Sequence, residues 1–283
     1  MWKGVYTMRI KLNGRQWGWH IFLCLLVMFL LAPIVYAIST SFKTLSDATN
    51  NVLSLIPEKF SVESYKSVLM RIPFIKITTN TFFIASSVTL FKIITSVLAA
   101  YSLVYFRFRG RNALYFILIS TMFIPFTVTM IPNYLTIGKL GLLNSSWGVI
   151  LPQLADALGI FLLRQSMRTI PRSLIEVCQL DNIGHLRIIK DIVVPLIKPS
   201  IISTGIIFFI NSWNEYVWPV LILKTEEHFT LSLALQMFIN AEGGTDVTVA
   251  MAISVMTMIL PLALYIIFQR FIINTFTQSG IKG

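Results

Sequence analysis

Three ionisable side chains, Lys92, Asp156 and Glu215, stand inside long apolar stretches of the chain. A charge is costly in apolar surroundings, so each of them must meet a partner or line a polar cavity. Such groups can hydrogen-bond a polar solute or relay a proton. Alternatively, Lys92 pairs with Asp156 or Glu215, or either acid only holds helices together. Amide side chains in the same kind of stretch form a second tier of candidates: Asn133, Gln153, Asn211 and Asn214.

The spacing of four of these candidates predicts one helical face. Asn211, Asn214 and Glu215 lie three and four positions apart, and Trp218 follows one turn later. Amide and carboxylate groups beside an aromatic ring suit a sugar, whose hydroxyls need hydrogen-bond partners and whose ring stacks on aromatics. The alternative is that Trp218, with Trp213, belongs to the aromatic belt at the membrane surface.

Signatures of covalent, metal and nucleotide chemistry are missing from the sequence. It contains no G-x-x-x-x-G-K-[ST], H-E-x-x-H or G-x-S-x-G. The three histidines fall in separate segments, and neither cysteine has a C-x-x-C partner. Cys24 and Cys178 are expected in different environments, which argues against a disulfide between them. A chain of this kind that moves a solute uphill must take the energy from another protein or an ion gradient.

Composition places these residues in a membrane. Of 283 residues, 55% are apolar and only 12% are charged, with a mean hydropathy of +0.76. Soluble domains carry about 25% charged residues. At about 20 apolar residues per crossing, the chain accommodates six helices. We therefore expect an all-α integral membrane protein forming a single transmembrane domain over residues 1–283. The expected spans are 21–38, 79–105, 114–135, 147–163, 201–223 and 249–268.

The net charge of +11 is explained by orientation in the membrane. If both termini are cytoplasmic, fifteen of the 23 basic residues lie in cytoplasmic segments and seven lie outside, with Lys92 left in a span. This is the asymmetry that the positive-inside rule predicts. No basic stripe interleaved with aromatics remains, which argues against nucleic-acid binding.

The cytoplasmic loop 164–199 is too apolar to be a free loop. Ser173 to Glu176 fits the capping box S-x-x-E, and Pro171 suits a helix entrance. Asn182 and Gly184 can take left-handed conformations at the end of that helix. A second short helix is then expected to close at Pro195. The loop therefore predicts a helix, a sharp turn and a helix, with an apolar face open to the cytoplasm.

The same loop resembles the E-A-A loop of the permeases of ATP-binding-cassette importers. The family pattern P-x-x-L-x-E-A-A-x-x-D-G, followed by I-x-L-P-L-x-x-P, is similar to Pro171-Arg-Ser-Leu-Ile-Glu176-Val-Cys-Gln-Leu-Asp181-Asn182 and Ile192-Val-Val-Pro195-Leu-Ile-Lys-Pro199. Three further segments resemble the carbohydrate branch of this family, which includes maltose and glycerol-3-phosphate permeases. They are Gly159-Ile-Phe-Leu-Leu-Arg-Gln165, Asn211-Ser-Trp-Asn-Glu-Tyr-Val-Trp-Pro219 and the ending Gln269 to Gly283. The sequence departs from the pattern at Val177, Cys178, Asn182 and Val194.

The resemblance implies a type I, maltose-permease-like fold with a cytoplasmic coupling helix that docks in a cleft of a separate ATPase. Ile175 and Leu180 are expected to bury against that ATPase while Glu176 meets a basic residue there, or only completes its capping box. The bulk of Val177 and Cys178 requires a partner groove shaped to accept them. For Asp181 a turn or cap role is favoured. The expected coupling residues are Ile175, Glu176, Cys178, Leu180, Asp181, Asn182 and Gly184.

The resemblance also implies the partners. They are a second, homologous permease, two copies of the ATPase, an extracellular solute-binding lipoprotein and a sugar or related solute such as a glycerol phosphate. ATP and Mg would be bound by the ATPase, and this chain would hold no cofactor and catalyse nothing. The location would be a bacterial or archaeal cell membrane. An ion-coupled secondary transporter and a membrane enzyme are the rival interpretations.

Two further segments carry open expectations. Pro125 and Pro132 are expected to kink or interrupt the third span, as a moving gate or as static packing. The apolar stretch 229–244 is too short to cross the membrane. In related permeases a loop at this place reaches into the binding protein; alternatively, it rests on neighbouring helices.

Overall fold

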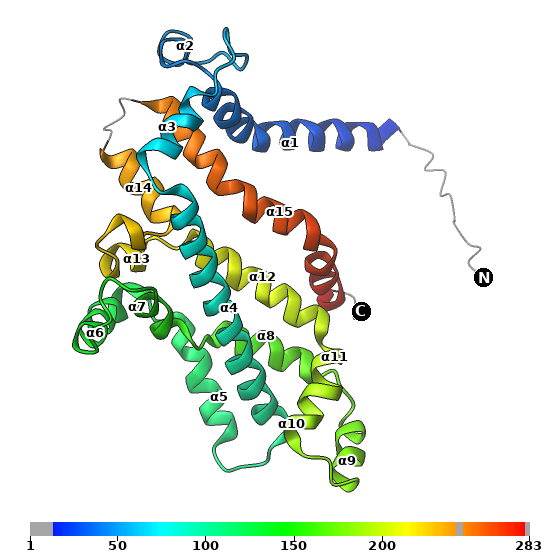
Figure 1. Cartoon of the computed structure of the whole chain (residues 1–283). Coiled ribbons are helices and arrows are strands. Elements are labelled where there is room, and N and C mark those ends of the chain that lie inside the picture. Colours follow the sequence, from blue (N-terminus) through cyan, green and yellow to red (C-terminus); the bar gives the residue numbers. More distant parts are fainter. Residues whose placement is uncertain (1–13, 242–245, 281–283) are drawn as a thin grey trace. The chain divides into compact units, whose positions relative to one another are not determined.

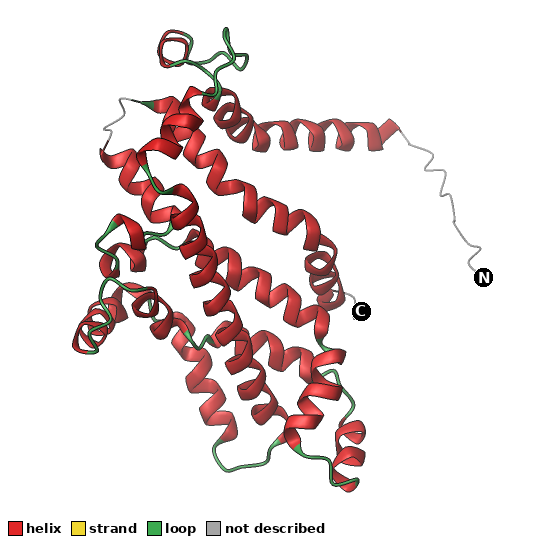
Figure 2. Ribbon diagram, viewed as in Figure 1, coloured by secondary structure: helices red, strands yellow, loops and turns green. Residues whose placement is uncertain are grey.

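The structure, a computed structural model, describes residues 14–241 and 246–280. Every regular element in these ranges is a helix (Figure 2). The first eight are α1 (Gly14–Ser41), α2 (Leu45–Asn50), α3 (Glu63–Arg71), α4 (Phe74–Tyr105), α5 (Arg111–Ser120), η1 (Thr121–Phe123), α6 (Phe126–Lys139) and α7 (Ser146–Ile150). The next six are η2 (Leu151–Gln153), α8 (Ala157–Met167), α9 (Arg172–Leu180), α10 (His185–Ile188), η3 (Ile189–Val193) and α11 (Val194–Leu196). The last five are α12 (Lys198–Asn214), α13 (Val217–Ile222), η4 (Glu226–His228), α14 (Leu231–Ala241) and α15 (Val247–Gly280).

Three unbroken helices are long and apolar enough to cross a membrane: Trp17–Ser41, Phe74–Tyr105 and Val247–Gln269. Three bent pairs have the same length and composition, so the described chain offers up to six spans. Two of these pairs, 111–139 and 146–167, contain the expected spans 114–135 and 147–163. The third pair, His185–Leu196 with Lys198–Asn214, is bent by 84° and reaches only part of the expected span 201–223.

The break inside the expected third span falls at a residue that cannot continue a helix. Pro125 follows η1 and caps α6, and the two helical pieces differ in direction by 97°. Proline lacks the N–H that a helix interior requires. The expected interruption of the third span is therefore seen at Pro125. Pro132, in contrast, is accommodated inside α6. The helix expected to close at Pro195 continues through that residue to Leu196, so this expectation is wrong by one residue.

Of the described residues, 14–67 and 246–255 form one compact unit, and 68–241 and 256–280 form the other. In the first unit, the aromatic rings of Phe42 and Phe60 stack with their centroids 4.7 Å apart. The hydroxyl of Tyr65 lies 2.8 Å from the Ser41 hydroxyl. The Lys43 ammonium is buried and donates to the backbone carbonyls of Asn51 and Ser54, at 3.0 and 2.6 Å. Backbone acceptors thus satisfy a buried charge in the polar segment after α1.

The second unit is organised around α4, which packs against α8 and α12 (Figure 1). One apolar cluster joins the first half of α4 to α7, α13 and α14 through residues such as Ile84, Val149 and Ile222. A second cluster joins the last turns of α4 to α8 and α9. Leu231, Leu233 and Ala234 of α14 belong to the first cluster. The segment 229–234 therefore rests on neighbouring helices, whereas residues 242–245 lie outside the described part.

Gly159 allows α8 to approach α4 and α12 closely. A side-chain carbon at this position would overlap the hydroxyl oxygen of Ser96 on α4 and would lie 2.6 Å from the ring of Phe208 on α12. Gly205, on α12, has nothing closer than 3.9 Å at the corresponding place. Glycine is therefore required by packing at position 159 but not at position 205.

This difference predicts opposite effects for two alanine substitutions. Gly159→Ala should lower the free energy of unfolding by about 1 to 3 kcal/mol, because the added methyl group overpacks the contact of the three helices. Gly205→Ala is the matched control and should be neutral or stabilising, because alanine costs less backbone entropy in a helix. Thermal unfolding of the purified protein in detergent measures both. Equal stability of the two variants would contradict this packing.

Candidate functional site

The helix expected to couple the chain to a partner is α9. It begins at Arg172 after Pro171, which leaves no side chain to cap its first N–H groups. The predicted capping box between Ser173 and Glu176 is therefore wrong, because both residues already lie inside the helix. At the other end, the N–H of Ile183 donates to the Cys178 carbonyl at 2.9 Å. This bond is the long bond of a Schellman motif, which closes the helix.

The turn after α9 depends on one residue in a left-handed conformation. Asn182 has φ of 58°, as predicted, and asparagine tolerates this region better than most residues. Gly184 has φ of −64°, so the prediction of a left-handed conformation is wrong there. Asp181 is exposed and occupies the C-cap position of α9. The turn therefore rests on Asn182 alone.

The inner face of α9 attaches it to the membrane helices. Ile175 and Cys178, three positions apart, are buried at 3% and 8% exposure. They pack in one cluster with Val104 of α4 and with Leu163 and Met167 of α8. The expectation that Ile175 buries against an ATPase is therefore wrong. Cys178 packs in the same cluster but also lines an apolar groove on α9, so its fit to a partner groove stays a prediction. Both side chains are already used to hold α9 on its own chain.

The outer face of α9 carries a second apolar row. Leu174, Val177 and Leu180 recur every three residues and are 42%, 56% and 84% exposed. Beside this row lies a groove of about 710 Å³, lined mainly by apolar side chains. Its lining residues are Pro171, Ser173, Leu174, Val177, Cys178, Asp191, Ile192, Pro195 and Leu196. The helix is thus apolar on two faces, and only one of them is covered by the chain itself.

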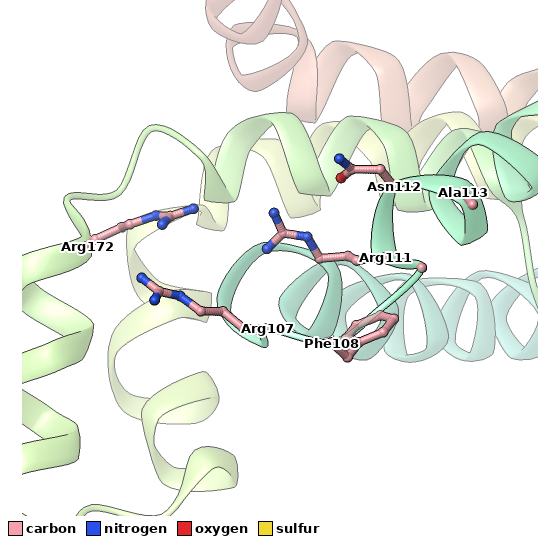
Figure 3. A pocket seen from close by; sticks show the side chains of 7 residues that line it. Arg107, Phe108, Arg111, Asn112, Ala113 and Arg172 are labelled. Carbon is pink, nitrogen blue, oxygen red and sulfur yellow. The ribbon is translucent and has the colours of Figure 1, made fainter.

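Glu176 is exposed between these faces, so its carboxylate is accessible to a partner. It borders a cavity of about 260 Å³ together with Arg107, Arg111 and Arg172. These three arginines also line a neighbouring cavity of about 430 Å³, in which their guanidinium groups extend toward one another (Figure 3). The start of α9 is therefore strongly basic.

Lys92 and Asp156 form an ion pair between α4 and the start of α8. The Lys92 ammonium lies 3.0 Å from Oδ2 of Asp156, and the side chains are 15% and 25% exposed. Oδ1 of Asp156 accepts the N–H groups of Leu158 and Gly159, at 2.9 and 3.2 Å. The carboxylate thus caps α8 and neutralises the lysine at the same time. This is the pairing alternative that the sequence left open.

Glu215 does not share a helical face with Asn211 and Asn214, because α12 ends at Asn214. Its Oε1 accepts the N–H groups of Val217 and Trp218, at 2.9 and 3.2 Å. A carboxylate at this place satisfies the first N–H groups of α13. The prediction of one continuous face through Trp218 is therefore wrong, and its cause is the break at Glu215. Asn211 and Asn214 do lie on α12, and both are exposed.

The tryptophans after α12 are buried. Trp218 is 1% exposed, and its ring meets that of Phe126 edge to face, with centroids 5.9 Å apart. Trp213 is fully buried and donates its Nε1–H to the carbonyl of Thr257 at 3.3 Å. Neither ring presents a free surface to lipid or to a solute in the chain as described. They are packing residues of the apolar cluster around α13.

The remaining path candidates are half-buried. Gln153 donates to the Val149 carbonyl at 3.0 Å, and Asn133 lies on α6. Within the ranges that the structure describes, no group of three or more His, Cys, Asp or Glu residues is placed to hold a metal ion. The polar groups of the membrane core are therefore suited to hydrogen bonding, while the exposed apolar row of α9 is suited to docking.

The fold is therefore one of bent apolar helices, with the amphipathic helix α9 packed on the ends of α4 and α8. Residues 92–277 match the family described as "Binding-protein-dependent transport system inner membrane component". The chain belongs to this family. It is therefore a membrane permease component of an importer that works with a binding protein, as the E-A-A loop indicated.

Curated relatives agree over nearly the whole length. The sn-glycerol-3-phosphate transport system permease protein UgpE of Brucella melitensis is 28% identical over 268 residues, covering 92% of this chain and 95% of that protein. UgpE of Yersinia pestis bv. Antiqua is 31% identical over 267 residues, with the same coverage.

Solved structures support the fold. A chain of a bacterial ABC transporter involved in the import of the acidic polysaccharide alginate superposes with a TM-score of 0.78 at 28% identity, covering 89% of this chain and 94% of that one. A chain of an alginate ABC transporter in complex with an alginate pentasaccharide-bound periplasmic protein gives 0.66 at 14% identity, covering 90% and 93%. The type I importer fold inferred from the sequence is confirmed.

Sequence reasoning placed Val177 and Leu180 against a partner, but it missed Leu174 as the third member of the outer row, and it missed the arginine cluster. Leu174 and Val177 share a three-residue spacing with Leu180, and that spacing was visible in the sequence. Which of the two apolar faces is covered, however, depends on the distant residues of α4 and α8. The convergence of Arg107, Arg111 and Arg172 depends on the same packing.

The double role of Asp156 predicts a graded series of variants. Asp156→Asn keeps a capping acceptor but leaves Lys92 without its counter-charge, and should cost about 1 to 3 kcal/mol of unfolding free energy. Asp156→Ala also removes the cap and should cost about 1 kcal/mol more. Removing both charges with Lys92→Met and Asp156→Asn should recover part of the loss. Thermal unfolding in detergent provides the measurement.

Asp181→Asn is the control, because this carboxylate is exposed and should contribute less than about 0.5 kcal/mol. The interpretation fails if Asp156→Asn is as stable as the unchanged chain, or if the double variant is less stable than both single variants.

Proposed function

We propose that this chain is one of two permease subunits of an ATP-driven importer, and that α9 is the helix through which a separate ATPase acts on it. The observation that carries the proposal is the exposed apolar row Leu174, Val177 and Leu180. Exposed apolar surface of this extent on an amphipathic helix marks an interface. Lipid is not its occupant in this proposal, because charged and polar residues surround the row: Arg172, Glu176, Gln179 and Asp181.

Docking at this row would transmit movement because the opposite face of α9 is packed against membrane helices. The inner face of α9 packs on α4 and α8, and α4 also contacts α12. A partner that binds the outer face and moves would therefore displace three membrane helices together. Side chains in protein interiors are closely packed, so the helices that they join move as a unit. Glu176, exposed beside the row, would pair with a basic residue of the ATPase.

Energy would come from the partner because the chain has no phosphate-binding loop of its own in its sequence. ATP and Mg would be bound by two copies of the ATPase, and this chain would contribute no catalytic residue. Proton coupling through Asp156 or Glu215 is disfavoured, since Asp156 is paired with Lys92 and Glu215 caps α13. We place α9 and both termini in the cytoplasm, in keeping with the distribution of basic residues.

The solute proposed is a polyhydroxylated one: a sugar, an oligosaccharide or a glycerol phosphate. Exposed amides on α12, Asn211 and Asn214, can bond hydroxyl groups from half of a path that a second permease completes. Among the relatives, glycerol-3-phosphate and alginate systems differ in solute size but share hydroxyl groups. An extracellular solute-binding protein would deliver the solute. The cell membrane of a bacterium or archaeon is the proposed location.

A single charge in the outer row tests the docking proposal. Leu180→Asp should reduce co-purification of the ATPase by at least about tenfold, because burial of a leucine contributes about 1.5 to 3 kcal/mol and an unpaired carboxylate adds a penalty. The amount of permease in the membrane should not change, since Leu180 is 84% exposed.

Leu53→Asp is the matched control, because Leu53 is 92% exposed and lies in the polar segment after α1. It should retain the ATPase fully. Full retention by Leu180→Asp, or equal loss in both variants, would refute docking at α9.

A further inference from the structure

Three arginines from three different helix ends converge on one cavity. Arg107 follows the last turn of α4, Arg111 opens α5 and Arg172 opens α9. Their side chains border a space of about 430 Å³ and extend toward one another from separate ribbons (Figure 3). The rest of the lining is Phe108, Gly110, Asn112 and Ala113. Residues far apart in the sequence thus build an open basic pocket, in which Arg107 and Arg172 are exposed and Arg111 is half-buried.

The positive charge of this pocket has no counter-charge among the residues that the structure describes. In the described part of the protein, no carboxylate lies within ion-pair distance of any of the three guanidinium groups. Arg111 donates one hydrogen bond, to the carbonyl of Phe106 at 3.2 Å. Glu176 borders the adjoining cavity but makes no ion pair with them. Like charges held together repel one another, and a bound anion would offset that repulsion.

Backbone donors add to the positive field. α5 is 10 residues long and starts after Gly110, whose φ is 84°; α9 is 9 residues long and starts after Pro171. Neither helix has a side-chain cap. In α9 the Leu174 N–H donates to the Pro171 carbonyl at 3.2 Å, which leaves the N–H groups of Arg172 and Ser173 for a ligand. Helix N-termini and arginine side chains both favour phosphate as a ligand. One guanidinium group can donate two parallel hydrogen bonds to two oxygens of the same phosphate. The chemistry of the pocket is therefore that of a phosphate site.

The position of the pocket indicates the source of the phosphate. Residues 106–110 join the end of the long apolar helix α4 to the apolar helix α5. The expected spans 79–105 and 114–135 would place this connection at the membrane surface. Phe108 in this loop is 43% exposed, as suits a side chain that reaches the lipid interface, whereas the ring of Phe106 packs edge to face against His185, with centroids 4.8 Å apart. Basic pockets between membrane helices on the cytoplasmic side bind anionic headgroups.

We propose that Arg107, Arg111 and Arg172 bind the headgroup phosphate of an anionic phospholipid. This inference rests on the proposed orientation, which puts the pocket at the cytoplasmic leaflet. The lipid ties the end of α4 to the start of α9, and so steadies the helix on which the ATPase is proposed to act. Occupancy falls as salt rises, because the attraction is electrostatic and is screened.

The test measures lipid retention, which requires neither transport nor ATP. The full-length chain is purified in a neutral detergent and titrated with phosphatidylglycerol or with zwitterionic phosphatidylcholine, and bound lipid is counted by native mass spectrometry. We expect preferential retention of phosphatidylglycerol. Replacing the three arginines together, R107Q, R111Q and R172Q, should weaken retention by at least about tenfold, since each basic residue near a membrane surface contributes measurably.

Two matched variants separate a built site from a basic surface. Arg109→Gln and Arg168→Gln remove exposed arginines of the same region that do not line the pocket, and they should change retention less than about twofold. Replacing the three pocket arginines by lysine keeps the charge but removes the fork geometry. This change should weaken retention by several-fold. If the triple glutamine variant does not fold, Arg111→Gln alone takes its place, with a smaller expected loss.

Four results would overturn the proposal. They are unchanged retention in the glutamine variants, equal loss in the Arg109→Gln control, displacement of the lipid by millimolar inorganic phosphate, and absence of lipid from the importer once the ATPase is bound. The third would assign the pocket to free phosphate, and the fourth would assign it to an acidic side chain of the ATPase. Loss of transport with normal lipid retention would refute only the proposed function.

Discussion

The burial of Ile175 and Cys178 beneath α9 is the contact on which the functional geometry depends. These two side chains fix α9 to the ends of α4 and α8 and leave Leu174, Val177 and Leu180 facing outward. Without the inner contact, α9 would be an amphipathic helix on a flexible loop. A displacement of α9 would then bend the loop and would not move α4 and α8. With that contact, the helix becomes part of the apolar cluster of the membrane helices. Close packing of its inner face thus joins α9 to α4 and α8, as the proposed coupling role requires.

The polar residues of the membrane core first serve the structure. Lys92 and Asp156 neutralise one another while Asp156 caps α8, and Glu215 satisfies the start of α13 after the helix breaks. Each charge or carboxylate in the core therefore supports a bend, and bent helices let backbone and side chains face a path. Asn211 and Asn214 are exposed on α12, where the proposed solute path would run, and Nδ2 of Asn214 donates to the Ile210 carbonyl at 3.0 Å.

The sequence predicted the class of fold well because apolar run length and proline positions are local signals. The helical membrane fold, the break at Pro125 and the left-handed Asn182 all follow from residues close together in the chain. Tertiary packing decided the rest. Ile175 was expected to face a partner, but its orientation depends on Val104 and Leu163, which are far away in sequence. The face through Trp218 failed because Glu215 ends α12, and the periodicity of a helix gives no sign of such an end.

The central claim is that force reaches the membrane helices through the inner face of α9. The most direct measurement compares solute uptake with ATP hydrolysis in vesicles that contain the assembled importer, with and without the substitution Ile175→Ala. This change removes apolar contact behind α9 and leaves its outer row in place. The account predicts that the ATPases stay bound and hydrolyse ATP while the solute imported per ATP falls severalfold, because the cavity lets α9 move without α4 and α8. An unchanged ratio of uptake to hydrolysis would contradict it.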